Sequence, residues 1–70
     1  MKNKTEINIP IWCKMNLTIE EAVAYSNIGE HRLRKELSDP LCPFVLNVGN
    51  SKKLIKRKEF EEWNSEIEFI

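Results

Sequence analysis

The sequence predicts an α+β fold, a small domain of three short helices with a two-stranded β-hairpin and an N-terminal arm or edge strand. Three observations support this prediction. Two short amphipathic segments lie on either side of a turn within residues 17–38. Residues 44–56 contain two β-prone stretches around a Gly-Asn-Ser turn, and residues 57–68 repeat apolar side chains at helical spacing. Seventy residues suffice for one domain, residues 1–70, with a small core.

The first segment, residues 1–16, is predicted to be an extended arm or a short edge strand. Isoleucines alternate there with polar residues or proline: Ile7, Ile9 and Ile11. Pro10 excludes a central strand, because proline cannot donate a hydrogen bond to a neighbouring strand. Trp12 follows directly, and its large apolar surface is expected to cover one end of the core.

The next helix is predicted to begin after Thr18. Thr18 is a good N-cap, and Glu21 three residues later completes a capping box. One face of this helix is expected to meet the core: Ile19, Ala22, Val23 and Ser26. Asn27-Ile28-Gly29 forms the following turn, in which Ile28 fills the angle between the helices and Gly29 permits a tight start to the next helix.

The second helix is predicted to present a cationic face to solvent. Leu33 and Leu37 lie one turn apart and face inward, so His31 and Lys35 point outward, with Arg32 and Arg34 on the two flanks. The Ser38-Asp39-Pro40 sequence ends the helix, since proline disfavours a helical residue before it. Arginine bonds bidentately to phosphates and guanine edges. His31, Arg32, Arg34 and Lys35 are therefore candidate nucleic-acid contacts.

The remaining elements are a hairpin and a third helix. Residues 44–48 and 52–56 are the predicted strands, and the helix begins at about Lys58 with an apolar stripe of Phe60, Trp63 and Ile67. The order helix, turn, helix, hairpin, helix is that of a small winged helix-turn-helix, whose second helix can enter a DNA major groove. The wing tip supplies four more candidate DNA contacts, which are Asn50, Ser51, Lys52 and Lys53.

Charge is balanced overall but segregated along the chain. Eleven basic and eleven acidic side chains cancel, which by itself argues weakly against nucleic acid. The basic residues form two clusters, namely Arg32, Arg34 and Lys35, and then Lys52, Lys53, Lys56, Arg57 and Lys58. The acidic residues gather near the end of the chain. Because screening limits charge effects to about 8 Å at physiological salt, a neutral chain of this kind can still have a positive face.

No catalytic, metal or cofactor site is expected. Cys13, His31 and Cys42 lack a fourth ligand and zinc-site spacing, so both thiols are interpreted as packed or partly exposed. His31 and Arg34 have the His-x-x-Arg spacing of tyrosine recombinases, but Tyr25 precedes this pair, and such an enzyme needs further positive groups along a much larger catalytic domain. Neither a signal peptide nor a membrane-spanning segment is expected, because no apolar stretch follows the basic residues near the N-terminus and no run approaches about 18 apolar residues. A cytoplasmic location is therefore expected.

Six short segments, spread over nearly the whole chain, stand out together: Ile9-Pro-Ile-Trp12, Leu17-Thr-Ile-Glu-Glu-Ala22, Ile28-Gly-Glu30, Leu33-Arg-Lys35, Ile55-Lys-Arg-Lys58 and Phe60. In sequence and in spacing these segments resemble the excisionases of conjugative transposons. The resemblance implies a recombination directionality factor, which binds near the ends of a mobile element, bends DNA and helps an integrase excise the element. It also implies that helix 30–37 enters the major groove and that wing residues 50–53 contact the adjacent minor groove.

The partners expected from this resemblance are double-stranded DNA, a tyrosine-recombinase integrase and neighbouring copies of the chain on DNA, without a membrane. Two alternatives stay open. A MerR-like winged-helix transcriptional regulator would use the same residues without an integrase. A protein-interaction module that acts without DNA would explain the zero net charge and the acidic last helix.

Overall fold

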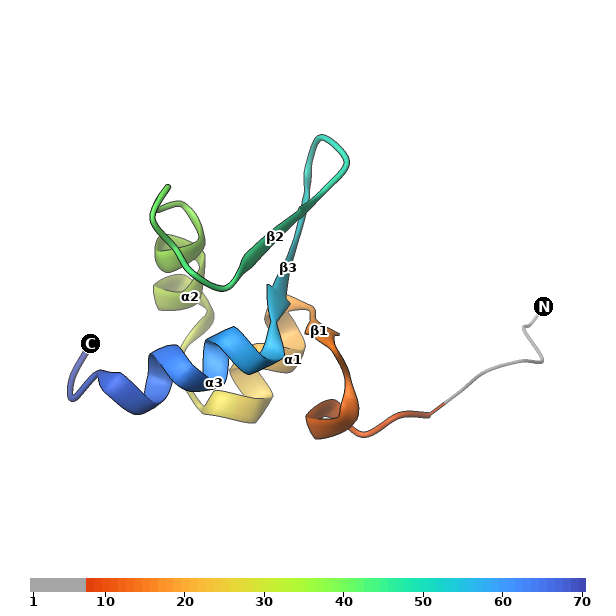
Figure 1. Ribbon diagram of the computed structural model, residues 1–70, viewed down its shortest axis with the longest axis horizontal. Helices are drawn as coiled ribbons and strands as arrows, with labels where there is room; N and C mark the ends of the chain where they lie inside the picture. Colours follow the sequence, from red (N-terminus) through yellow and green to blue (C-terminus); the bar gives the residue numbers. More distant parts are fainter. Residues whose placement is uncertain (1–7) are drawn as a thin grey trace.

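The computed structural model describes residues 8–70 and confirms the predicted fold class (Figure 1). Three helices and a small antiparallel sheet form a winged helix-turn-helix arrangement. In chain order the elements are the 3-10 helix η1 (Ile11–Cys13), β1 (Asn16–Leu17), α1 (Ile19–Ser26), α2 (Glu30–Leu37), β2 (Val45–Val48), β3 (Lys52–Lys56) and α3 (Arg57–Glu66). None of these helices is both long and apolar enough to cross a membrane.

The sheet has the strand order β1-β3-β2, with β3 antiparallel to both neighbours. Ile55 is paired with Leu17 on one side and with Val45 on the other. Because side chains alternate between the faces of a sheet, these three share one face, which packs against the core. Leu46 and its partner Leu54 lie on the opposite, outer face.

The core is small and draws on the sheet and all three helices. Its buried residues are Leu17, Ala22, Leu33, Leu37, Phe44, Ile55 and Phe60. Three aromatic rings pack together at one end: the Phe44 centroid lies 5.0 Å from that of Phe60 and 4.9 Å from that of Trp63. This cluster fixes α3 against the loop that enters the hairpin, as the predicted apolar stripe on the last helix requires.

The N-terminal segment differs from the prediction in two respects. Ile7 lies outside the described residues, Asn8–Pro10 have no regular structure, and the edge strand is β1, further along the chain. Trp12 is 64% exposed and does not cover the core. Its neighbour Ile11 packs against the core instead. The reason is local: Pro10 is extended and its carbonyl accepts from the Cys13 N–H, which makes a tight 3-10 turn.

The turn between α1 and α2 also differs in its backbone. The capping box is confirmed, since the Thr18 side chain accepts from the Glu21 N–H and the Glu21 carboxylate accepts from the Thr18 N–H. However, the left-handed residue is Asn27, at φ 63°, whereas Gly29 is extended at φ −63°. Asparagine tolerates this conformation better than most residues. Gly29 is therefore not needed for its positive-φ freedom.

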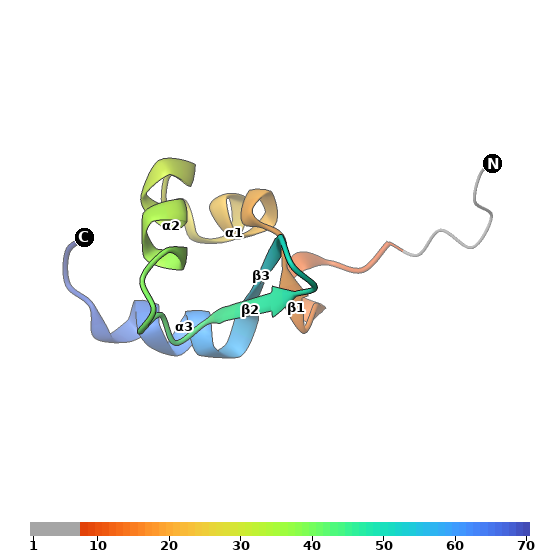
Figure 2. The same cartoon turned by 90° about the horizontal axis from the view of Figure 1, so that it is seen from above.

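The hairpin and last helix follow the prediction to within one or two residues. β3 spans the expected residues, while Phe44 precedes β2 and is buried, with its carbonyl accepting from the Lys56 N–H at 2.8 Å. α3 begins at Arg57 and ends at Glu66, so Ile67 is its extended C-cap. α2 and the hairpin both lie above α3 in Figure 1, and from above α1 and α2 lie next to each other while β2 runs alongside α3 (Figure 2).

Candidate nucleic-acid interface

Helix α2 has the orientation that its sequence predicts. Leu33 and Leu37 are buried, while His31, Arg34 and Lys35 are exposed. Arg34 Nε donates to the Glu30 carboxylate at 2.7 Å, across one turn of the same helix. Exposed pairs of this kind contribute little stability in water. The Arg34 guanidinium can therefore exchange this partner for an external anion at small cost.

Three of the eight predicted contact residues, Arg34 of α2 with Ser51 and Lys53 of the hairpin, meet at one hollow. This open depression has a volume of about 300 Å³ and is lined by Ile19, Arg34, Leu37, Ser38, Ser51 and Lys53. Lys53 Nζ lies 3.4 Å from the Leu37 carbonyl oxygen at the end of α2, to which it donates. The structure thus brings Arg34, Ser51 and Lys53 together on one side of the domain, although their positions in the sequence are well separated.

The tip of the hairpin projects beyond the body of the domain (Figure 1). Asn50, Ser51, Lys52 and Lys53 are all exposed. Gly49 begins the turn at φ 65°, a left-handed conformation that glycine adopts without strain. All four predicted contact residues of the hairpin are consequently accessible from solvent.

Arg32 is separated from the other predicted contacts. It is half-buried, and its guanidinium donates to the carbonyl oxygen of Ile70. This contact holds the C-terminal end of the chain against α2, and Figure 2 shows that end turning towards the helix. Arg32 therefore already has an internal partner, on the flank of α2 away from the hollow.

The second basic cluster divides into three parts in the folded chain. Lys52 and Lys53 belong to the hairpin tip, whereas Lys56 and Lys58 line a different groove at the base of the sheet. Arg57 is used internally: its Nε donates to the Lys14 carbonyl at 2.6 Å and its Nη1 donates to the Glu61 carboxylate at 3.0 Å. The basic sequence from 52 to 58 is therefore not one positive patch.

Arg57 belongs to a polar network that the sequence analysis did not identify. The Tyr25 hydroxyl donates to the same Glu61 carboxylate, which joins α1 to α3. This hydrogen bond, with Arg57 beside it, lowers the pKa of Glu61, and the negative Glu61 raises the pKa of Tyr25. Only the i,i+4 spacing of Arg57 and Glu61 was visible in the sequence.

A second polar contact holds the N-terminal segment to α1. Lys14 Nζ donates to the Glu21 carboxylate, and this bond, with those from Thr18, lowers the pKa of Glu21. Together with the contact of Arg57 to the Lys14 carbonyl, it ties the segment before β1 to two helices.

Cys13 and Cys42 are both free thiols and do not form a disulfide with each other. Cys13 is exposed, whereas Cys42 is half-buried against the core, and burial raises the pKa of the Cys42 thiol. Among residues 8–70, no three His, Cys, Asp or Glu side chains are placed to hold a metal ion.

Comparison with known proteins gives two matches. Residues 2–67 match a family model described as the excisionase from transposon Tn916. The chain is also 40% identical over 57 residues to the excisionase from transposon Tn916 of Streptococcus agalactiae serotype V; the match covers 81% of this chain and 85% of that protein. No solved structure matches the chain.

Proposed function

The chain belongs to the family of the excisionase from transposon Tn916. On this premise we propose that it is an architectural DNA-binding protein, which bends DNA at the ends of a mobile element and promotes integrase-mediated excision. Family membership supports a role in transposon excision. The observation that most supports DNA binding is the hollow where Arg34 of α2 meets Ser51 and Lys53 of the hairpin.

The two elements would contact neighbouring grooves. In this proposal the exposed face of α2, with His31, Arg34 and Lys35, enters the major groove. The hairpin tip, residues 50–53, reaches the adjacent minor groove or its backbone. The hollow between them is lined by the cations Arg34 and Lys53, whose charges would attract a phosphate group. Arg32 is assigned a lesser role, because the Ile70 carbonyl already accepts from it.

Such a protein acts by changing the shape of DNA, with no bond made or broken by the protein itself. Bending a site of 20–30 base pairs costs about 1–6 kcal/mol. Contacts in two grooves by one small domain can offset part of that cost, and several copies bound side by side would share it. The bent DNA would then be the form in which an integrase assembles for excision.

The direct test is binding to the end sequences of the element, with and without integrase, over a range of salt concentrations. Each phosphate contact contributes a slope of about −0.9 in log K against log salt. Arg34→Ala and Lys53→Ala are each expected to weaken binding and to reduce this slope by about 1. Leu33→Ala serves as the matched control on α2, because it removes a buried side chain and should instead destabilise the fold by about 2–5 kcal/mol.

Two results would contradict the proposal. One is an affinity for DNA that does not depend on salt, as expected of a module that recognises proteins alone. The other is normal binding without any stimulation of excision in the presence of integrase; altered transcription in that case would favour the regulator alternative.

A further inference from the structure

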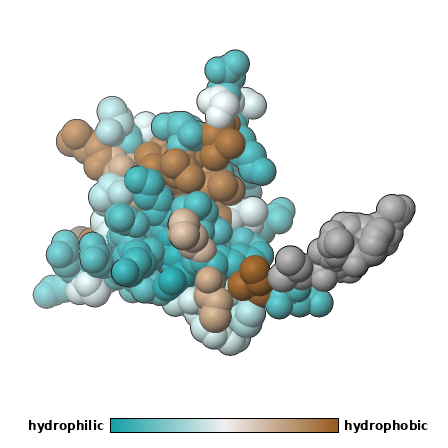
Figure 3. All heavy atoms as spheres, turned by 45° about the vertical axis from the view of Figure 1, so that its right-hand side comes forward, coloured by the Kyte–Doolittle hydropathy of each residue, from teal (hydrophilic) through white to brown (hydrophobic). Residues whose placement is uncertain are grey.

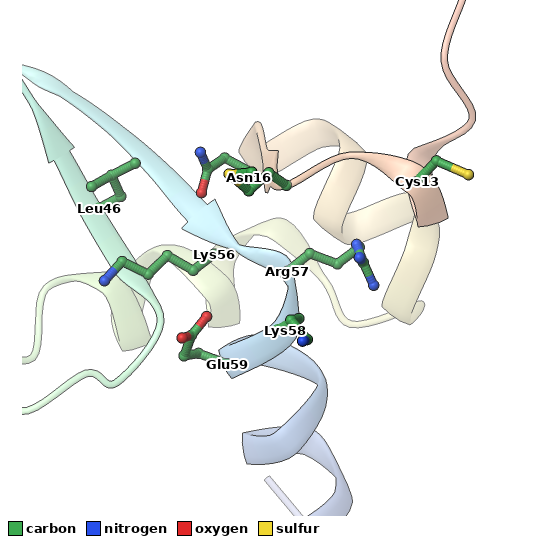
Figure 4. A pocket seen from close by; sticks show the side chains of 8 residues that line it. Cys13, Asn16, Leu46, Lys56, Arg57, Lys58 and Glu59 are labelled. Atoms are coloured by element: carbon green, nitrogen blue, oxygen red, sulfur yellow. The ribbon is translucent and has the colours of Figure 1, made fainter.

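A groove on the outer side of the sheet is not used by the proposed DNA interface. It has a volume of about 570 Å³ and lies where β1, β3 and the first turn of α3 meet (Figure 4). Its apolar part is formed by Met15, which is 82% exposed, and by Leu46 of β2. Its charged lining consists of Lys56, Arg57 and Lys58 with one acidic side chain, Glu59. The groove is therefore partly apolar, and positive side chains outnumber negative ones in its lining.

The apolar character extends over the outer face of the sheet. Leu46 and its partner Leu54 are only half-buried, and Val48 further along β2 is exposed. Figure 3 shows hydrophobic side chains gathered below the hairpin tip. Exposed apolar side chains beside cations suit an acidic peptide with apolar residues better than they suit DNA, whose backbone offers only charge.

The other end of the molecule carries a segment with this complementary chemistry. Ile67, the residue after α3, is extended, and residues 66–70 read Glu-Ile-Glu-Phe-Ile. Phe69 is 90% exposed, and Glu66 and Glu68 are exposed as well. The bond from Arg32 to the Ile70 carbonyl holds the end of this segment while the Phe69 side chain faces solvent.

The segment cannot reach the groove of its own molecule. Groove and segment lie at opposite ends of α3, whose ten residues span about 15 Å at 1.5 Å per residue. The contact between Ile70 and Arg32 moreover directs the chain end towards α2. In residues 8–70, no ion pair involves Lys56, Lys58, Glu66 or Glu68. All four charges are thus available to a second molecule.

We propose that the acidic C-terminal segment of one copy, residues 66–70, docks in the Met15–Leu46 groove of a second copy. Phe69 would occupy the apolar part, and Glu66 and Glu68 would lie against Lys56 and Lys58. The contact joins two different surfaces, so it repeats head to tail and builds an open chain. It needs no DNA and can therefore fail or succeed independently of the proposed function.

The contact is small, so the association is weak in solution. Five docked residues bury less than the roughly 1,200 Å² of a stable interface, and a dissociation constant on the order of 0.1–1 mM is expected. Two salt-sensitive pairs contribute, so high salt should weaken the association. Linkage of copies through a shared DNA molecule would strengthen it by raising the effective concentration.

The test is sedimentation equilibrium of the full chain without DNA, for the wild type and two variants, Phe69→Ser and Lys58→Glu. Each variant removes one half of the contact and is expected to raise the dissociation constant at least tenfold. Matched controls are Leu41→Ser, at an apolar residue that is 86% exposed elsewhere, and Lys52→Glu at the hairpin tip. Both should associate like the wild type.

Mixing the two variants gives the decisive measurement. Phe69→Ser retains the groove and Lys58→Glu retains the segment, so their mixture should form pairs of twice the 8.3 kDa monomer mass and nothing larger. A wild type that stays monomeric at millimolar concentration, or a mixture that does not pair, would overturn the proposal. The proposal would also be overturned if Phe69→Ser left the association intact, or if Lys58→Glu lowered the affinity for DNA without weakening the association.

Discussion

Removal of the Phe44 ring is expected to be among the most damaging single changes to this domain. Phe44 is completely buried, although it lies outside any helix or strand, and its ring is within 5.0 Å of the rings of both Phe60 and Trp63. Truncation to alanine would therefore leave a cavity between the hairpin loop and α3. The surrounding side chains belong to separate elements and can close it only in part.

The expected loss is a large share of the total stability. A buried phenylalanine replaced by alanine costs about 3–5 kcal/mol. At 0.05–0.15 kcal/mol per residue, a chain of 70 residues has a free energy of unfolding of roughly 4–10 kcal/mol. Phe44→Ala should thus remove about half of this free energy of unfolding, and it would unfold much of the protein only if the total lies at the low end of that range. Trp12→Ala, at a larger but mostly exposed aromatic residue, should change the free energy of unfolding by only about 0.5 kcal/mol.

Urea denaturation followed by tryptophan fluorescence measures both changes. Phe44→Ala is made in a Trp12→Phe background, and Trp12→Ala is compared with that same background. Trp63 is then the single tryptophan in every protein and reports directly on the cluster that contains Phe44. Phe44→Ala should shift the unfolding midpoint strongly towards low urea, or abolish the transition. Equal losses from Phe44→Ala and Trp12→Ala would refute the core described above and would restore Trp12 as the residue that closes it.

Two further predictions concern the turn and the polar contacts of the helices. Asn27→Gly should leave the free energy of unfolding nearly unchanged, whereas Asn27→Val should lower it by about 1–2 kcal/mol, because only the β-branched residue is strained at φ 63°. Chemical denaturation measures both variants, and equal effects would contradict this reasoning. The pKa values of Glu21 and Glu61 are lowered on folding, so the stability that they contribute is present above their ordinary pKa of 4.5 and is lost as the pH falls through the folded values. Glu61→Gln should therefore show a shallower loss of stability on acidification than the wild type, and parallel curves for the two proteins would exclude this role.

Much of the fold could be predicted because its signals are local. The capping box of Thr18 and Glu21 lies within one helical turn, and the spacing of Leu33 and Leu37 orients α2 without reference to the rest of the chain. The strand over residues 52–56 and the apolar stripe of α3 are equally short-range patterns. Each depends on a few neighbouring residues whose geometry follows from the period of a helix or strand.

The sequence predicted which residues belong to the candidate interface, but not how they are arranged in space. The exposed residues of α2 and the hairpin tip could be named from the sequence, but not which of them meet. Arg34 and Lys53 share a hollow, whereas Arg32, two residues before Arg34, bonds to the end of the chain. Neighbours in a charged run thus have different partners, because adjacent residues on a helix point in directions about 100° apart.

By itself, the sequence determined the kind and order of the elements, the inward faces of the helices and the family resemblance. Only the tertiary structure decided that Ile11 and not Trp12 packs on the core, that β1 forms the edge of the sheet, and that the Tyr25 hydroxyl donates to Glu61. The physical reason is the range of the interactions. Periodicity and capping act within one or two turns, whereas exposure, strand register and cross-element hydrogen bonds depend on segments tens of residues apart that are brought together only by folding.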